Sequence, residues 1–105
     1  MSPMNDKLFT QLLQGGKPVL VEFWAPWCVY CRRLIPALNK IAEQYRDILT
    51  VGKVNIDDEP QRAQREQNEV IPTLIIYKDG QALGSIVAPE SKARIEQFIQ
   101  ETLGI

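Results

Sequence analysis

The sequence contains no histidine and only two cysteines, and both shortages narrow the chemistry that the chain can carry. Without histidine there is no Cys–His nucleophilic pair, and two cysteines cannot by themselves complete a four-ligand zinc site. The chain also lacks an excess of either charge: it has 12 basic and 13 acidic residues, which give a net charge of −1. This balance gives no indication of nucleic acid or of an anionic membrane as a partner.

Long apolar runs are also missing. No stretch approaches the roughly 20 apolar residues of a membrane-spanning helix. Residues 1–7 lack the basic segment followed by an apolar one that marks a signal peptide. We therefore expect a cytoplasmic protein, in which a disulfide is more often catalytic than structural. With 105 residues, 45% of them hydrophobic, the chain has apolar material for one core, which predicts a single domain over residues 1–105.

Both cysteines lie in one short segment, Trp27-Cys28-Val29-Tyr30-Cys31, which follows an apolar run and opens a helical pattern. Thiols three residues apart lie on one face of a helix, with Cβ atoms about 5–6 Å apart, so a disulfide can close with little rearrangement. Cys28 is expected at the helix N-terminus, where free N–H groups and the helix dipole favour a thiolate. The segment therefore has the minimum equipment for disulfide exchange. The alternatives are a structural disulfide or two inert core thiols.

Hydrophobic periodicity predicts alternating helices and strands. Residues 19–24 form a nearly continuous apolar run, typical of a central strand buried on both faces. Other predicted strands span residues 49–56, 73–77 and 81–87, and helices span residues 6–14, 28–45, 57–68 and from 89 or 91 to 103. The last two strands flank Lys78-Asp79-Gly80, a strong hairpin signal. Since a strand–helix–strand unit needs parallel strands, we predict an α/β fold, a mixed sheet of about four strands with helices on both faces.

Several motifs together resemble the thioredoxin family. They are, in chain order, Phe23-Trp24-Ala25-Pro26-Trp27-Cys28-x-x-Cys31-Arg32, Pro36, Lys53-x-Asn55-x-Asp57 and Ile71-Pro72-Thr73-Leu74. A Cys-x-x-Cys motif alone is a weak signal, but this set comes in family order and spacing from about residue 19 to the C-terminus. The resemblance implies the thioredoxin-like fold and a thiol–disulfide oxidoreductase that reduces protein disulfides through Cys28 and Cys31.

The sequence departs from the family pattern at three places. Glu22 stands where the family has a buried aspartate, and the family's first strand is expected to be missing, since only a helical pattern precedes residue 19. Val29 and Tyr30 replace the usual Gly-Pro between the cysteines. Tyr30, unlike a proline, has a backbone N–H. We expect this N–H to point at the Cys28 sulfur, to stabilise its thiolate and to make the couple more oxidising.

The resemblance assigns a role to each candidate site residue. Cys28 is the exposed nucleophile and Cys31 the resolving thiol, Glu22 exchanges protons with Cys31, and Lys53 is the charge partner of Glu22. Judged from the residues alone, Glu22 interrupts an apolar run, so either its carboxyl is buried with a raised pKa or its stem reaches water. Substrate contacts are expected from Trp27, Val29, Tyr30, Ile71, Pro72 and Ala88.

Pro72 and the two tryptophans have competing interpretations. Only about 5–6% of X–Pro bonds in folded proteins are cis. The resemblance nevertheless predicts a cis bond at Pro72, which leaves the backbone of Ile71 free to pair with an extended substrate segment. Trp27 is expected to cover the disulfide, although a place in the core is the alternative. Trp24 is expected in the core.

The resemblance also implies partners. These are protein substrates with disulfides and a flavin-dependent thioredoxin reductase as electron donor, with no cofactor besides the Cys28–Cys31 couple; we expect a monomer. Two other functions stay open. Tyr30 precedes the second cysteine as in glutaredoxins, which suggests a glutathione-coupled enzyme, although the flanking tryptophans argue against it. Alternatively, the chain is a binding or scaffold subunit whose cysteines are incidental.

Overall fold

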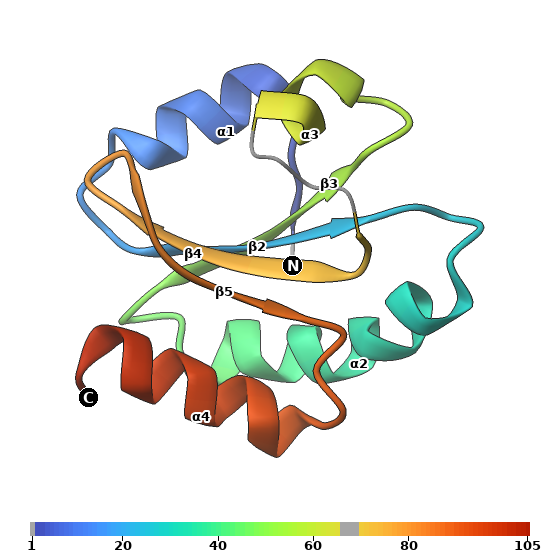
Figure 1. The fold of residues 1–105 in the computed structure, drawn as a ribbon. Helices are drawn as coiled ribbons and strands as arrows, with labels where there is room; N and C mark the ends of the chain where they lie inside the picture. The colour runs from blue at the N-terminus through green and yellow to red at the C-terminus, as the bar shows by residue number, and fades with distance from the viewer. Residues whose placement is uncertain (1, 66–69) are drawn as a thin grey trace.

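The computed structural model describes residues 2–65 and 70–105, and within them a mixed sheet lies between two layers of helices (Figure 1). The strands are β1 (Ser2–Pro3), β2 (Val19–Trp24), β3 (Thr50–Asn55), β4 (Thr73–Lys78) and β5 (Gln81–Val87), in the order β1-β3-β2-β4-β5. The helices are α1 (Asp6–Leu13), α2 (Val29–Gln44), α3 (Pro60–Arg65) and α4 (Lys92–Leu103). Helices α1 and α3 cover one face of the sheet, and α2 and α4 cover the other.

The four long strands confirm the predicted mixed sheet. Strand β2 pairs in parallel with β3 and antiparallel with β4, and β4 and β5 form the predicted hairpin. Asp79 and Gly80 at its tip both have positive φ, the conformation that a tight hairpin turn needs.

The prediction that the family's first strand is missing is wrong. Ser2 and Pro3 pair in parallel with Gly52 and Lys53 of β3, so the described sheet has five strands rather than about four. A two-residue strand is too short to show the alternation of apolar and polar residues that marks longer strands. Its pairing is therefore visible only in the tertiary structure.

Capping residues set the ends of the helices. Cys28 and Ser91 are the N-caps of α2 and α4, close to the predicted starts, and Gly104 ends α4 in the left-handed conformation with φ 70°. Helix α3 begins at Pro60, later than the predicted 57, because residues 56–58 form a turn in which Asn55 Oδ1 accepts from the N–H of Asp57. The predicted end of this helix, residue 68, lies outside the described residues.

Strand β2 lies between two apolar cores. Its side chains alternate, with Leu20 in the core under α2 and α4 and with Val21 and Phe23 in the core under α1. The prediction of a central strand buried on both faces is therefore confirmed. By the same alternation Glu22 faces the α2 and α4 side, the side of the helix that carries the cysteines. None of the described helices is long and apolar enough to cross a membrane.

Candidate active site

Cys28 and Cys31 form a disulfide at the start of α2, with Cα atoms 5.2 Å apart. Cys28, the N-cap, is partly exposed, whereas Cys31 is completely buried one turn further along. The predicted difference in exposure between the two cysteine residues is thus confirmed. Because the first N–H groups of a helix have no intrahelical acceptor, they and the helix dipole stabilise a thiolate at Cys28 when the disulfide is reduced.

The sequence predicts that the backbone N–H of Tyr30 donates to the Cys28 sulfur, but the structure shows a different donor. The hydrogen bond to Cys28 Sγ, 3.2 Å long, comes from the N–H of Cys31 and not from that of Tyr30. An N-cap side chain bonds either the second or the third helical N–H, and here it bonds the third. Any residue type at position 30 leaves this donor in place. Tyr30 instead makes a hydrogen bond through its side chain: its hydroxyl donates to the carbonyl of Pro89 over 2.6 Å.

Glu22 is completely buried in β2, and neither carboxyl oxygen has a hydrogen-bond partner among the described residues. Burial raises its pKa to about 8, while the positive charge of Lys53 opposes the rise. Lys53 is the residue paired with Glu22 across β2 and β3. The structure therefore confirms the buried interpretation and not the one in which the stem reaches water. A carboxyl that titrates near neutral pH can both take and give a proton.

Lys53, the cross-strand neighbour of Glu22, also lines a cleft at the protein surface. Its Nζ lies 4.6 Å from the centre of the Trp24 ring, and both side chains line a cleft of about 460 Å³ with Asn5, Asn55, Asp58 and Glu59. Trp24, predicted for the core, is only half-buried because it forms part of this cleft at the end of β2. The cleft brings solvent to Lys53, so its charge stays hydrated on one side while it faces Glu22 on the other.

The Ile71–Pro72 bond is cis, as predicted. Pro72 is buried, and its carbonyl accepts a hydrogen bond of 2.9 Å from the N–H of Ala88. Ala88 itself has φ 46°, a left-handed conformation that is uncommon for a residue with a Cβ atom. Two of the predicted substrate-contact residues, Pro72 and Ala88, are thus joined directly although they lie on either side of the β4–β5 hairpin.

Trp27 and Val29 present apolar surface beside the disulfide. The Trp27 side chain is 66% exposed and Val29 is 52% exposed, so Trp27 does not belong to the core. The indole Nε1 of Trp27 donates to Asp57 Oδ2 over 2.8 Å, which ties the residue before Cys28 to the turn after β3. Its expected role as a cover over the disulfide stays a prediction.

Two residues that support the site received no role from the sequence. Asp57 holds Trp27, and Pro89 accepts the hydroxyl of Tyr30. Asp57 belongs to the motif Lys53-x-Asn55-x-Asp57, which was a usable signal. Nothing in the sequence marks Pro89, because its contact depends only on how the chain folds back after β5.

Comparisons with known proteins agree with this geometry. The family model described as Thioredoxin matches residues 1–101. The chain is 41% identical over 101 residues to Thioredoxin 1 of Synechococcus elongatus, covering 95% of this chain and 94% of that protein. It is 38% identical over 100 residues to the thioredoxin of Alicyclobacillus acidocaldarius, covering 95% of each. It is 44% identical over 94 residues to the thioredoxin of Mycobacterium tuberculosis, covering 90% of this chain and 81% of that protein.

These matches span nearly the whole chain and include the segment with both cysteines. The cysteines form the disulfide of a Cys-x-x-Cys motif at a helix start, where Cys28 is partly exposed and Cys31 is buried. The chain therefore belongs to the thioredoxin family and is a thiol–disulfide oxidoreductase that acts by dithiol–disulfide exchange.

Proposed function

We propose that the chain works as a reductase of protein disulfides, with Cys28 as the attacking thiol and Cys31 as the resolving thiol. The unequal exposure of the two cysteine residues carries this proposal. The partly exposed Cys28 can meet a substrate disulfide, whereas the buried Cys31 can meet only a sulfur already bound to Cys28. The order of the two steps follows from this geometry.

The dithiol–disulfide exchange proceeds in two steps. The Cys28 thiolate attacks one sulfur of the substrate disulfide; that S–S bond breaks, a mixed disulfide forms, and the other substrate sulfur leaves as a thiolate that takes a proton. Cys31 then passes its proton to the ionised fraction of Glu22 and attacks the Cys28 sulfur. The mixed disulfide breaks, the second substrate thiolate leaves, and Cys28–Cys31 is oxidised. Two electrons move from the dithiol to the substrate.

Lys53 is the charge partner of Glu22, and its pairing with Glu22 supports this. Contacts to the substrate are assigned to Trp27, Val29, Tyr30, Ile71, Pro72 and Ala88. The family implies disulfide-bearing protein substrates and a reductase partner. We assign the partner role to a flavin-dependent thioredoxin reductase, and the setting to a monomer in the cytoplasm that needs no cofactor besides its own disulfide.

Trapping of substrates tests the order of the steps. Cys31→Ser is expected to accumulate mixed disulfides with insulin, because resolution is blocked, whereas Cys28→Ser accumulates almost none. In the wild-type protein, once its disulfide has been reduced, iodoacetamide at neutral pH is expected to label Cys28 before Cys31. Mass spectrometry of both adducts gives the readout. Equal trapping by the two variants, or equal labelling of the two thiols, would contradict the assignment.

Activity assays separate the alternatives. The wild-type protein is expected to accelerate the reduction of insulin by dithiothreitol. Turnover supported by glutathione and glutathione reductase would instead indicate a glutathione-coupled enzyme. A protein that does neither while keeping its fold would be a binding or scaffold subunit.

A further inference from the structure

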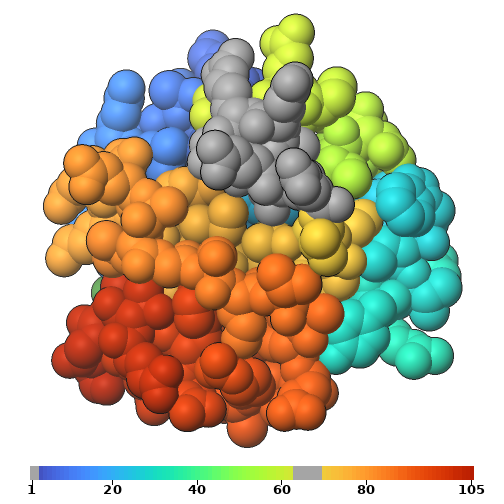
Figure 2. Space-filling view, in the orientation of Figure 1, coloured from blue at the N-terminus to red at the C-terminus, as the bar shows by residue number. Residues whose placement is uncertain are grey.

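The two side chains between the cysteines point in different directions. Val29 is 52% exposed, whereas Tyr30 is half-buried and packs against the core under α2 and α4. The hydroxyl of Tyr30 donates to the carbonyl of Pro89 over 2.6 Å, across 59 residues of sequence. In the space-filling view, the orange segment after β5 lies directly against the cyan to teal start of α2 (Figure 2).

The segment that Tyr30 holds is strained at Ala88 and partly exposed. Ala88 has φ 46°, and a residue with a Cβ atom keeps such a conformation only where its surroundings fix it. Together with Arg94 the segment borders a surface hollow of about 320 Å³, and Ala88 is exposed while Pro89 is buried. Among the described contacts, two hydrogen bonds hold the segment: Ala88 N–H to Pro72, and Tyr30 hydroxyl to Pro89.

These two bonds form one chain of contacts across the site. It runs from Tyr30 through Pro89 and Ala88 to Pro72, so it joins the helix start with the cysteines to the residues assigned to substrate binding. A proline at position 30 has no hydroxyl and cannot make the first of these bonds.

We infer that Tyr30 is a positioning residue. Its hydroxyl fixes the Ala88–Pro89 segment against the start of α2 and thereby sets where Ala88 and the backbone at Pro72 lie for contact with an extended protein segment. This inference rests on the proposed function, because the contacts at Ala88 and Pro72 matter for protein substrates and much less for small disulfides, which need to reach only the Cys28 sulfur.

Tyr30→Phe tests the inference, because it removes the hydroxyl and keeps the ring and the backbone N–H. Single-turnover oxidation of the reduced protein by insulin, followed by tryptophan fluorescence, is expected to need an insulin concentration about three to ten times higher for half-saturation, the effect of losing one such hydrogen bond. The limiting rate should change by less than about twofold. Oxidation by bis(hydroxyethyl) disulfide should slow much less than oxidation by insulin.

Tyr45→Phe is the matched control: it also removes a tyrosine hydroxyl, but at the other end of α2, where the hydroxyl bonds Glu96 and Gln100 rather than the Ala88–Pro89 segment. It should leave the half-saturating insulin concentration unchanged. Equal slowing of Tyr30→Phe with insulin and with the small disulfide would overturn the inference, because Tyr30 would then act on Cys28 itself. So would an unchanged half-saturating concentration.

Amide hydrogen exchange gives an independent readout. The N–H of Ala88, bonded to Pro72, should exchange about three to ten times faster in Tyr30→Phe than in the wild-type protein or in Tyr45→Phe. Unchanged exchange would overturn the positioning role. If the wild-type protein failed to reduce insulin, the proposed function would fall, and this exchange measurement would still decide whether Tyr30 positions the segment.

Discussion

At Glu22, a single side chain combines full burial with a titration close to neutral pH. The family has a shorter aspartate at this position. The longer Glu22 side chain is still completely enclosed, and its pKa rises to about 8. Such a carboxyl destabilises the folded state when it ionises, since the unfolded chain ionises it at about 4.5. Its retention in an apolar strand fits a catalytic use rather than a structural one.

Glu22→Gln is expected to change how stability depends on pH. The folded wild-type protein holds its proton up to about pH 8 and the unfolded chain only to about 4.5, so wild-type stability falls as pH rises through this window. The variant lacks this loss. Its free energy of unfolding relative to wild type should therefore rise by about 2–4 kcal/mol between pH 5 and pH 9, measured by urea unfolding.

The same variant is expected to slow resolution of the mixed disulfide more than its formation, because an amide cannot take the proton of Cys31. Glu101→Gln, at an exposed position on α4, is the control and should show neither effect. Suppose that the stability difference did not depend on pH and that resolution of the mixed disulfide were unchanged. The carboxyl of Glu22 would then be ionised already at pH 5 or would take no part in resolution.

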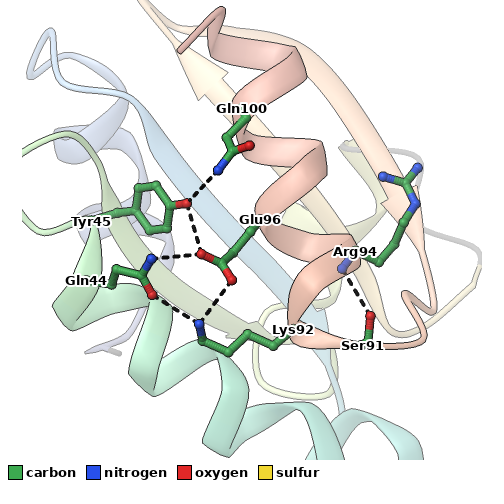
Figure 3. A network of polar contacts seen from close by, with 7 residues as sticks. All are labelled: Gln44, Tyr45, Ser91, Lys92, Arg94, Glu96 and Gln100. Atoms are coloured by element: carbon green, nitrogen blue, oxygen red, sulfur yellow. Dashed lines mark hydrogen bonds and ion pairs between the residues drawn. The ribbon is translucent and has the colours of Figure 1, made fainter.

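At the scale of the elements, α2 and α4 are joined by a polar network around Glu96 (Figure 3). Its Oε1 accepts from Gln44 Nε2 over 2.8 Å and from the Tyr45 hydroxyl over 3.1 Å, and its Oε2 accepts from Lys92 Nζ over 3.1 Å. The hydrogen bond from Lys92, followed by those from Gln44 and Tyr45, holds the pKa of Glu96 below its usual value of 4.5. The network therefore fastens the end of the cysteine-bearing helix to α4.

Glu96→Gln is expected to lower the melting temperature by a few degrees at pH 7. A depressed folded pKa stabilises the protein above the unfolded value of 4.5, and this contribution is lost as pH falls through the lower folded value. The difference between variant and wild type should consequently shrink towards pH 3 in thermal unfolding followed by circular dichroism. Glu43→Gln, an exposed position on α2, should be neutral at both pH values; a constant difference for Glu96→Gln would exclude an ionic contribution.

At the scale of the whole molecule, the sheet separates two apolar cores. Over the core under α1, contacts between residues far apart in the sequence join α3 to α1. Within the part of the chain that the structure describes, helix α3 spans the six residues Pro60–Arg65, too few to be stable alone. Its Arg62 donates to Asp6 over 2.8 Å and to Thr10 over 3.2 Å, and the guanidinium lies 4.5 Å from the ring centre of Phe9. Arg62 thus fixes α3 to α1 while covering the apolar side chain beneath it.

Arg62→Met is expected to reduce the free energy of unfolding by about 1–3 kcal/mol, since it removes these polar contacts and the cation above Phe9. Insulin reduction at 25 °C should be unaffected, because the contacts of Arg62 given above join α3 to α1, whereas the cysteines lie at the start of α2. Urea unfolding gives the measurement. Arg46→Met, at an exposed position, is the control with the same change of side chain. Equal stability losses in the two variants would show that the tie contributes nothing specific.

The sequence by itself determined the features whose signals are local. The apolar run predicted β2 at residues 19–24, the turn residues predicted the β4–β5 hairpin, and the cysteine spacing predicted a disulfide at a helix start. Each of these depends on neighbours within a few residues, where periodicity, turn chemistry and helix geometry act directly. Family resemblance added the cis bond before Pro72, which local signals could not supply.

Only the tertiary structure decided the features that join distant parts of the chain. The two-residue β1 exists because it meets β3, Glu22 is neutral near pH 7 because two strands and a helix layer enclose it, and Tyr30 matters because the chain after β5 returns to α2. A sequence pattern records which side chains are apolar and how they are spaced. It does not record which remote carbonyl, carboxyl or strand edge will lie within hydrogen-bond distance, because that depends on the packing of the whole molecule.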